Sequence, residues 1–110
     1  MLDLAGFKPG DRVLDLGCGD GSIVLEAVAM GGEGIGVERL GVLVWYARIR
    51  AWMRGLHSRA RFHQDDIFTV PIPKAEIVVC YLFSEVNERL EPRLQEALSL
   101  GTRVVYRDFI

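Results

Sequence analysis

The sequence has few of the residues that build disulfide frameworks or metal sites. Its 110 residues include two cysteines and two histidines. Cys18 and Cys80 do not make a disulfide framework, and their spacing matches no zinc pattern. His57 and His63 have no companion at metal-ligand or triad spacing. We therefore expect no metal site, and this cysteine usage favours a reducing cytoplasm as the compartment.

Long apolar runs and a targeting segment are also missing. Apolar runs such as residues 42–47 are far too short to span a bilayer. The N-terminus lacks the basic start and the apolar run of a signal peptide. The formal net charge of −2 gives no electrostatic case for nucleic acid as a partner. With 50% hydrophobic and 25% charged residues, we expect residues 1–110 to form one globular domain.

What the sequence does contain is an alternation of short apolar runs and helical patterns. Patterns typical of buried strands occupy residues 12–16, 34–38, 61–64, 76–81 and 102–106. Helical patterns occupy residues 22–30, 41–55 and 87–100, and the two prolines in residues 70–73 indicate a loop. The alternation predicts an α/β fold, a doubly wound Rossmann-like parallel sheet with strand order 3-2-1-4-5. Ligands of such sheets bind at the carboxyl ends of the strands, where the order reverses.

The strongest motif follows the first strand, where residues 14–21 are L-D-L-G-C-G-D-G. Glycines at Gly17, Gly19 and Gly21 let the backbone turn tightly and let a ligand approach without meeting a Cβ. The helix that follows offers N–H groups to the polar atoms of a ligand. The dinucleotide fingerprint requires glycine where this sequence has Ser22, so the motif is not that fingerprint. A purely structural turn is the alternative.

Carboxylates at or near the ends of the first three strands narrow the choice of ligand. Asp15 favours a ligand that carries an ammonium and a sulfonium, such as S-adenosylmethionine, and would repel a pyrophosphate. Glu38 closes the second strand, where a carboxylate can accept from both ribose hydroxyls. After the third strand, Asp66 can accept from an adenine amine while the backbone N–H of Ile67 pairs with a ring nitrogen. Glu38 as a surface acid and Asp65-Asp66 as plain turn residues stay open as alternatives.

Further segments carry a resemblance to a known family. They are Leu43–Arg48, Arg50–Trp52, Gly55–His57, Tyr81–Phe83, Val86-Asn87, Leu90–Leu94 and Gly101–Val105. Together with the glycine motif they resemble the seven-strand S-adenosylmethionine methyltransferases. The resemblance is most specific to a protein-lysine methyltransferase group that includes broad-specificity archaeal enzymes and the mitochondrial enzyme that methylates the ATP synthase c-subunit. It extends over nearly all of the 110 residues.

The resemblance implies a protein-lysine N-methyltransferase whose cofactor is S-adenosylmethionine and whose partner is a protein with an accessible lysine. The expected cofactor contacts are Asp15, Gly17, Cys18 through its backbone, Gly19, Gly21, Glu38, Arg39, Asp66 and Ile67. Tyr81 ends the fourth strand over the predicted cleft and is the expected catalytic residue, which would orient the acceptor amine. A half-buried structural aromatic is the alternative for Tyr81.

The chain departs from the family at its ends. Members carry a segment before the first strand and two strands after the fifth, so we expect a domain shortened at both ends that lacks strands 6 and 7. An apolar fifth strand at a sheet edge predicts self-association through that edge. Three alternatives remain open: an NAD-type oxidoreductase domain, a cofactor-binding module without activity, and a small-molecule or nucleic-acid methyltransferase. The sequence lacks an Asn-Pro-Pro-Tyr type motif after the fourth strand, which disfavours amino-nitrogen methylation of bases or glutamine.

The helical pattern at residues 41–55 adds two expectations. Trp45 and Trp52 lie seven residues apart on one helix face, and because such a stripe usually belongs to the core, we expect both to be buried. A basic stretch accompanies this helix, made of Arg48, Arg50, Arg54, Arg59 and Arg61. We interpret it as a solvated face, with an acidic partner as the second interpretation.

Overall fold

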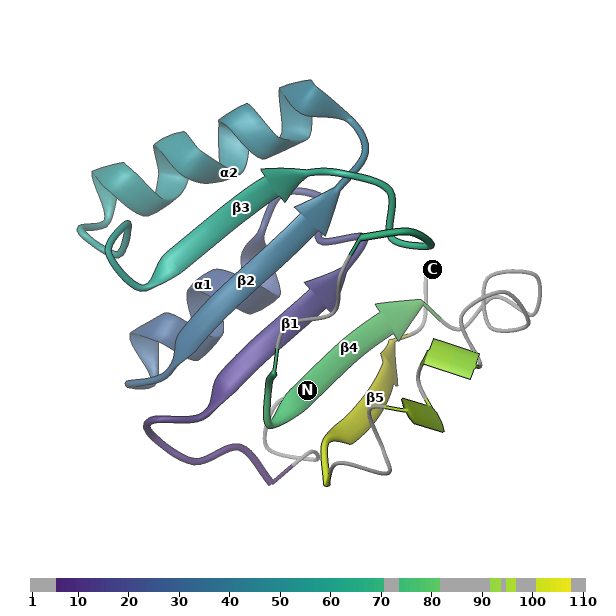
Figure 1. Ribbon diagram of the computed structural model, residues 1–110. Helices are drawn as coiled ribbons and strands as arrows, with labels where there is room; N and C mark the ends of the chain where they lie inside the picture. Colours follow the sequence, from purple (N-terminus) through teal and green to yellow (C-terminus); the bar gives the residue numbers. More distant parts are fainter. Residues whose placement is uncertain (1–5, 71–73, 82–91, 94, 97–100, 108–110) are drawn as a thin grey trace.

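The computed structural model describes residues 6–70, 74–81, 92–93, 95–96 and 101–107. Its centre is one sheet of five strands: β1 (Arg12–Leu16), β2 (Glu33–Glu38), β3 (Ala60–Gln64), β4 (Ile77–Tyr81) and β5 (Arg103–Arg107). All neighbouring strands pair in parallel, in the order β3-β2-β1-β4-β5 (Figure 1). The predicted fold class and strand order are confirmed.

Two helices, α1 (Ser22–Ala29) and α2 (Gly41–Met53), cover the same face of the sheet (Figure 1). They share a face because the chain passes from β1 to β2 to β3 in one direction, through crossovers of one hand. Each helix is followed by a glycine with left-handed φ, Gly31 at 94° and Gly55 at 70°. Glycine is the residue that adopts this helix-ending conformation at little cost, so both predicted ends are confirmed.

The predicted helix at residues 87–100 and the predicted loop at residues 70–73 lie largely outside the described residues. The described residues 92–93 and 95–96 are helical. No helix in the described part of the chain is long and apolar enough to cross a membrane.

The layer between the sheet and α2 leaves little room for the side chains of the helix and is in this sense narrow. A Cβ on Gly36 of β2 would lie only 2.7 Å from the sulfur of Cys18 and 2.8 Å from the ring of Phe62. The face of α2 that packs against this layer is correspondingly small and consists of Val44, Ala47 and Ala51. Because the side chains of Cys18 and Phe62 already fill this layer, only short side chains of α2 fit against it.

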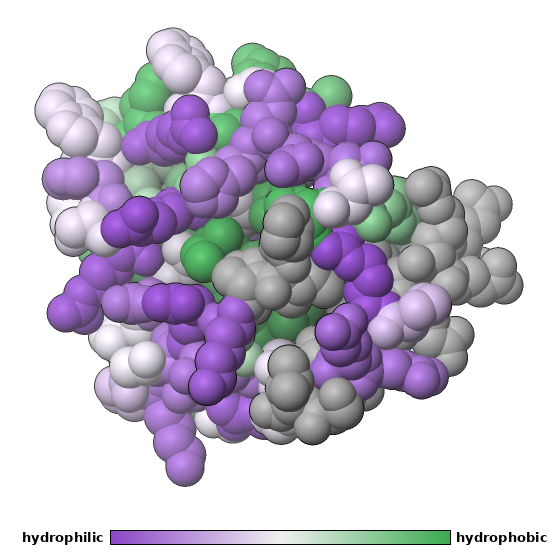
Figure 2. Space-filling view, in the orientation of Figure 1, coloured by the Kyte–Doolittle hydropathy of each residue, from purple (hydrophilic) through white to green (hydrophobic). Residues whose placement is uncertain are grey.

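The expectation that Trp45 and Trp52 belong to the core is wrong. Their side chains are 65% and 69% exposed. Because the narrow layer accepts only small side chains, the bulky apolar residues of α2 lie on the opposite face of the helix. The upper edge of the molecule, where α2 lies in Figure 1, shows pale and green surface beside purple in Figure 2.

Strand β5 lies at one edge of the described sheet, as the self-association prediction requires. The guanidinium of Arg103 on this strand donates to the carbonyl of Gly6 (2.7 Å) and to the carboxylate of Asp11 (3.0 Å). The described N-terminal segment is therefore held beside β5. Self-association through the edge stays a prediction.

Candidate cofactor site

The loop between β1 and α1 has a backbone that only glycine adopts easily. Gly17, Gly19 and Gly21 have φ values of 83°, 55° and 81°, in the left-handed region. The loop is fastened to β2, because the N–H groups of Gly17 and Cys18 both donate to the carbonyl of Val37, at 2.8 and 3.0 Å. The alternating glycines are thus required by the path of the loop.

Glu38 joins this loop at the carboxyl end of β2. One carboxylate oxygen accepts from the N–H of Gly19 and the other from the N–H of Leu40, each at 3.0 Å. The side chain is half-buried. The structure therefore brings together two elements that the sequence predicted separately, the glycine loop and the acid that closes the second strand.

The turn after β3 meets the same edge of the sheet. The N–H of Asp65 donates to the backbone carbonyl of Glu38 (3.1 Å), which holds the turn beside β2. The carboxylate of Asp66 accepts from the N–H of Phe68 (2.8 Å), the arrangement of an Asx turn. Asp66 thus has the turn role that was the alternative, and its exposed side chain lies at the site edge. Adenine contacts from Asp66 and Ile67 stay a prediction.

Asp15 and Cys18 are both buried. Asp15 is fully buried in the central strand, in register with Gly36 on β2 and Val79 on β4. The thiol side of Cys18 packs in the core between α1, α2 and β3, which leaves its backbone on the loop. Arg39 is exposed after β2, and its carbonyl accepts from the side-chain amide of Gln64 (3.2 Å).

The carboxylate of Asp15 affects the pKa of Cys80 on the neighbouring strand β4. Burial, and then the nearby carboxylate of Asp15, raise the pKa of the Cys80 thiol from about 9 to about 11. A thiol whose pKa is higher in the folded than in the unfolded chain contributes stability below pH 9 that is lost as the pH rises toward 11.

Replacement of Cys80 by alanine should therefore flatten the alkaline stability profile. We expect the free energy of unfolding of the native chain to fall by roughly 2 kcal/mol more than that of Cys80→Ala between pH 9 and 11. Urea denaturation at a series of pH values measures both slopes. Equal slopes would show that the buried thiol is not the group that loses its proton.

Tyr81 is the last residue of β4, which places its backbone between the carboxyl ends of β1 and β5. Its side chain lies outside the described part of the structure. The catalytic role assigned to Tyr81 stays a prediction.

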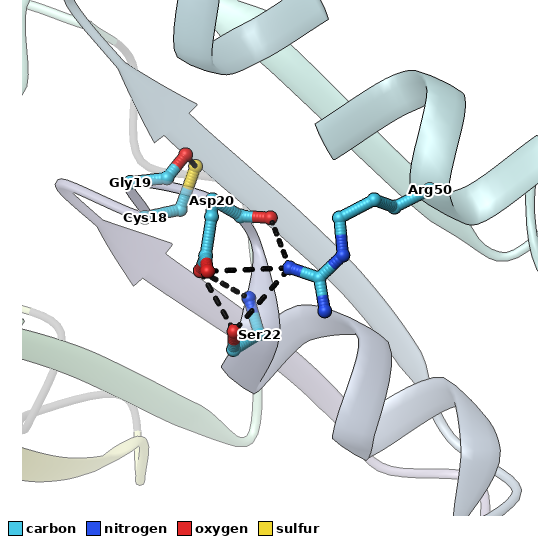
Figure 3. A network of polar contacts seen from close by, with 5 residues as sticks. All are labelled: Cys18, Gly19, Asp20, Ser22 and Arg50. Carbon is cyan, nitrogen blue, oxygen red and sulfur yellow. Dashed lines mark hydrogen bonds and ion pairs between the residues drawn. The ribbon is translucent and has the colours of Figure 1, made fainter. Parts of the chain in front are cut away.

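A third element, α2, also reaches the glycine loop. The guanidinium of Arg50 donates to the carbonyl of Asp20 (3.0 Å) and lies 3.3 Å from its carboxylate. The same carboxylate accepts from the hydroxyl of Ser22 (2.7 Å) and from its N–H (3.1 Å). Figure 3 shows Arg50 extending from α2 to this cluster at the start of α1. The loop is therefore held from β2 on one side and from α2 on the other.

The sequence matches a known protein family. The family model described as the ANTKMT methyltransferase domain matches residues 15–110. The chain belongs to this family. The prediction of a seven-strand methyltransferase is confirmed, and with it the resemblance to the protein-lysine methyltransferase group.

Two relatives of this methyltransferase domain are named as lysine N-methyltransferases. A lysine N-methyltransferase of the ATP synthase c-subunit from Xenopus laevis is 38% identical over 84% of this chain and 41% of the relative. A protein-lysine N-methyltransferase from Saccharolobus islandicus is 36% identical over 99% of this chain and 69% of the relative. The chain thus spans between about two fifths and about two thirds of the length of these relatives.

A solved structure is similar at the level of fold and sequence. An RNA methyltransferase from Salinibacter ruber, in complex with S-adenosyl-L-homocysteine, superposes with a TM-score of 0.82 and is 39% identical. The match covers 87% of this chain and 63% of that one.

Sequence reasoning missed two arginines of this methyltransferase domain. Arg50 appeared only as part of a basic stretch, and the acid at Asp20 lies thirty residues away, so no local pattern pairs them. Arg93 donates to the carbonyl of Ile67 (2.6 Å) and ties the segment after β4 to the candidate adenine turn. The only signal for Arg93 was its place in the Leu90–Leu94 segment of the family resemblance.

Removal of the Arg50 side chain should loosen the loop without unfolding the domain. We expect Arg50→Ala to raise the Kd for S-adenosylmethionine about three- to tenfold, because one hydrogen bond from a charged group and a half-exposed ion pair are lost. Calorimetric titration measures the change. Arg54 is an exposed arginine directly after the same helix, and Arg54→Ala should leave the Kd unchanged. A higher Kd in both variants would assign the effect to the loss of positive charge in general rather than to the contact between Arg50 and the loop.

Proposed function

We propose that this chain is the cofactor-binding domain of an S-adenosylmethionine-dependent protein-lysine N-methyltransferase. The observation that carries the proposal is the hydrogen bond between Glu38 and Gly19, which places a carboxylate at the glycine loop of a methyltransferase-family domain. Relatives named as lysine N-methyltransferases support the reaction type. Solved neighbours in complex with S-adenosyl-L-homocysteine support the cofactor.

The residues present fit that cofactor. The left-handed glycines give a loop whose backbone a ligand can approach closely. The Glu38 carboxylate accepts from two backbone N–H groups, one on each oxygen, and its remaining lone pairs can accept from ribose hydroxyls. Asp15 adds a buried negative charge below the loop, which favours a cationic ligand over a pyrophosphate. In this proposal Asp66 and Ile67 hold the adenine.

For methyl transfer, the protein must mainly align the methyl group with the acceptor amine and exclude water. S-adenosylmethionine, when bound, supplies a methyl group on a sulfonium, which is already a good leaving group. The acceptor lysine must first lose a proton, since its free pKa is about 10.4, and a surrounding of low polarity lowers that value. In this proposal Tyr81 and nearby carbonyls orient the neutral amine in line with the methyl group.

Methylation of RNA is the second candidate. It is favoured by the 39% identity to a structure named as an RNA methyltransferase. The net charge of −2 and the absence of an Asn-Pro-Pro-Tyr type motif after β4 count against it.

The test has a binding arm and a transfer arm. Calorimetry should detect saturable binding of S-adenosylmethionine and none of NAD, and binding of NAD alone would overturn the proposal. The protein is then incubated with radioactive S-adenosylmethionine and a cell extract, and the labelled material is treated with protease or ribonuclease. Label in methyl-lysine after protein hydrolysis supports the proposal. Label that ribonuclease releases would establish the RNA candidate, and binding without transfer would leave a module that holds the cofactor only.

A further inference from the structure

The outer face of α2 is apolar along its whole length. The helix turns Val44, Ala47 and Ala51 toward the sheet, and its opposite face consists of Val42, Trp45, Tyr46, Ile49, Trp52 and Met53. All of these side chains except the partly buried Ile49 are more than half exposed. We call these six residues the outer face of α2. It has no charged residue, whereas the exposed side of a surface helix is ordinarily polar.

Positive charge flanks this apolar face. Residues 39–64 contain six arginines and not one of the 15 acidic residues of the sequence, although the whole chain carries a formal net charge of −2. On the helix, Arg48 and Arg50 lie on either side of the outer face, because the first reaches β3 and the second reaches the glycine loop. Arg54, Arg59 and Arg61 are exposed at and beyond the end of the helix. Arg48 and Arg54 therefore bring positive charge to the outer face, whereas Arg50 is paired with Asp20, and Arg61, in register with Ile35, lies on the other face of the sheet.

We propose that the outer face of α2 binds the surface of an anionic lipid bilayer, with the helix lying in the plane of the interface. The apolar ridge would enter the boundary between headgroups and acyl chains, while the guanidinium groups of the exposed Arg48 and Arg54 bind lipid phosphates and carboxylates. Tryptophan and arginine are the side chains that best suit such a boundary, since each combines an apolar body with a polar tip. The proposal concerns binding to one leaflet and needs no membrane-spanning helix.

The charges and the shape of the face favour a lipid surface over other partners. A second copy docked on the same face would bring Arg48 and Arg54 of both copies together, which like-charge repulsion opposes. A nucleic acid would meet the uncharged ridge first, and its phosphates gain nothing from Val42, Trp45 or Met53. A bilayer accepts a convex helix without a matching groove. The described N-terminal segment lies beside β5, at the opposite edge of the sheet from α2, and leaves this face uncovered.

The position of the helix connects this surface with the cofactor site. α2 begins at Gly41, three residues after Glu38, the last residue of β2, and Arg50 extends from the helix to the glycine loop. A bilayer bound along α2 would therefore lie next to the edge of the sheet at which substrates enter.

Trp45 and Trp52 are the two tryptophans of the sequence, so the intrinsic fluorescence reports on this face. The full chain is mixed with vesicles of phosphatidylcholine and phosphatidylserine, and with vesicles of phosphatidylcholine alone. We expect a blue shift of the emission, and quenching by brominated acyl chains, with the anionic vesicles only. In co-sedimentation, the double variant Trp45→Ser/Trp52→Ser and the charge reversal Arg54→Glu should each weaken binding about tenfold.

Matched variants test whether any exposed apolar side chain or any exposed charge would have the same effect on vesicle binding. Met30→Ser removes an exposed apolar side chain just after α1, and Lys8→Glu reverses an exposed charge elsewhere. Both should sediment with anionic vesicles as the native chain does. Equal binding to neutral vesicles, unchanged binding by the double tryptophan variant, or no quenching by brominated lipid would each overturn the proposal. A dimer that the double tryptophan variant abolishes, without vesicle binding, would assign the face to a second copy instead. None of these readouts depends on methyl transfer.

Discussion

Replacement of Glu38 by alanine is expected to raise the Kd for S-adenosylmethionine about 100-fold, because about 3 kcal/mol of hydrogen bonding is lost. The carboxylate accepts both from the glycine loop and from the segment that leads into α2, through Gly19 and Leu40. Hydrogen bonds to a charged group contribute about 1.5–3 kcal/mol each. The variant removes the acceptor for the ribose in the proposed complex and also loosens the loop that should receive the ligand.

The control is another glutamate of the same strand. Glu33 lies at the amino end of β2, away from the site, in an ion pair with Arg12 (3.1 Å) whose two side chains are about half exposed. Glu33→Ala should leave the Kd within a factor of about two, since exposed pairs contribute little. Calorimetry at matched ionic strength measures both variants. An unchanged Kd in Glu38→Ala would remove the structural basis for the proposed cofactor site. An equal rise of the Kd in both variants would assign the effect to the change in net charge.

The sheet and the site loop were predictable because their signals are local. β1 has the predicted bounds, and both helices end at the predicted glycines, since an apolar run and a left-handed residue act within a few positions of the chain. The alternating glycines and Glu38 were also predictable as members of a pattern. That Glu38 bonds to Gly19 required the pairing of β1 with β2, but the sheet topology implied that pairing.

The orientation of α2 and the contact between Arg50 and Asp20 could not be predicted from the sequence, because both depend on distances between elements. Periodicity alone assigns Trp45 and Trp52 to a face without saying which face meets the sheet. That choice follows from the narrow layer beside Gly36, where Ala47 and Ala51 fit and an indole does not. The tie between Arg50 and Asp20 was unpredictable for the same reason, because it bridges two elements that are adjacent only in the folded chain.

The second large expected effect concerns the free energy of unfolding and arises from close packing between the glycine loop and α2. Gly21 precedes α1 with φ at 81°, and a Cβ there would lie 2.6 Å from the ring of Phe62 and 3.0 Å from the Cβ of Ala47. Gly21→Ala therefore combines backbone strain of about 1–2 kcal/mol with overpacking of about 1–3 kcal/mol. We expect the free energy of unfolding to fall by about 3 kcal/mol, measured by urea denaturation.

Gly55 offers the matched comparison for this variant. Its φ of 70° is also left-handed, but no atom of the described residues lies within 4 Å of the Cβ that alanine would add. Gly55→Ala should therefore cost about 1 kcal/mol, from backbone strain alone. Both changes restrict the unfolded chain equally, so that contribution cancels in the difference between them. A difference of about 2 kcal/mol then measures the packing between the glycine loop, Phe62 and Ala47. Equal losses would mean that the loop can shift away from α2, in which case the helix does not hold the site loop in place.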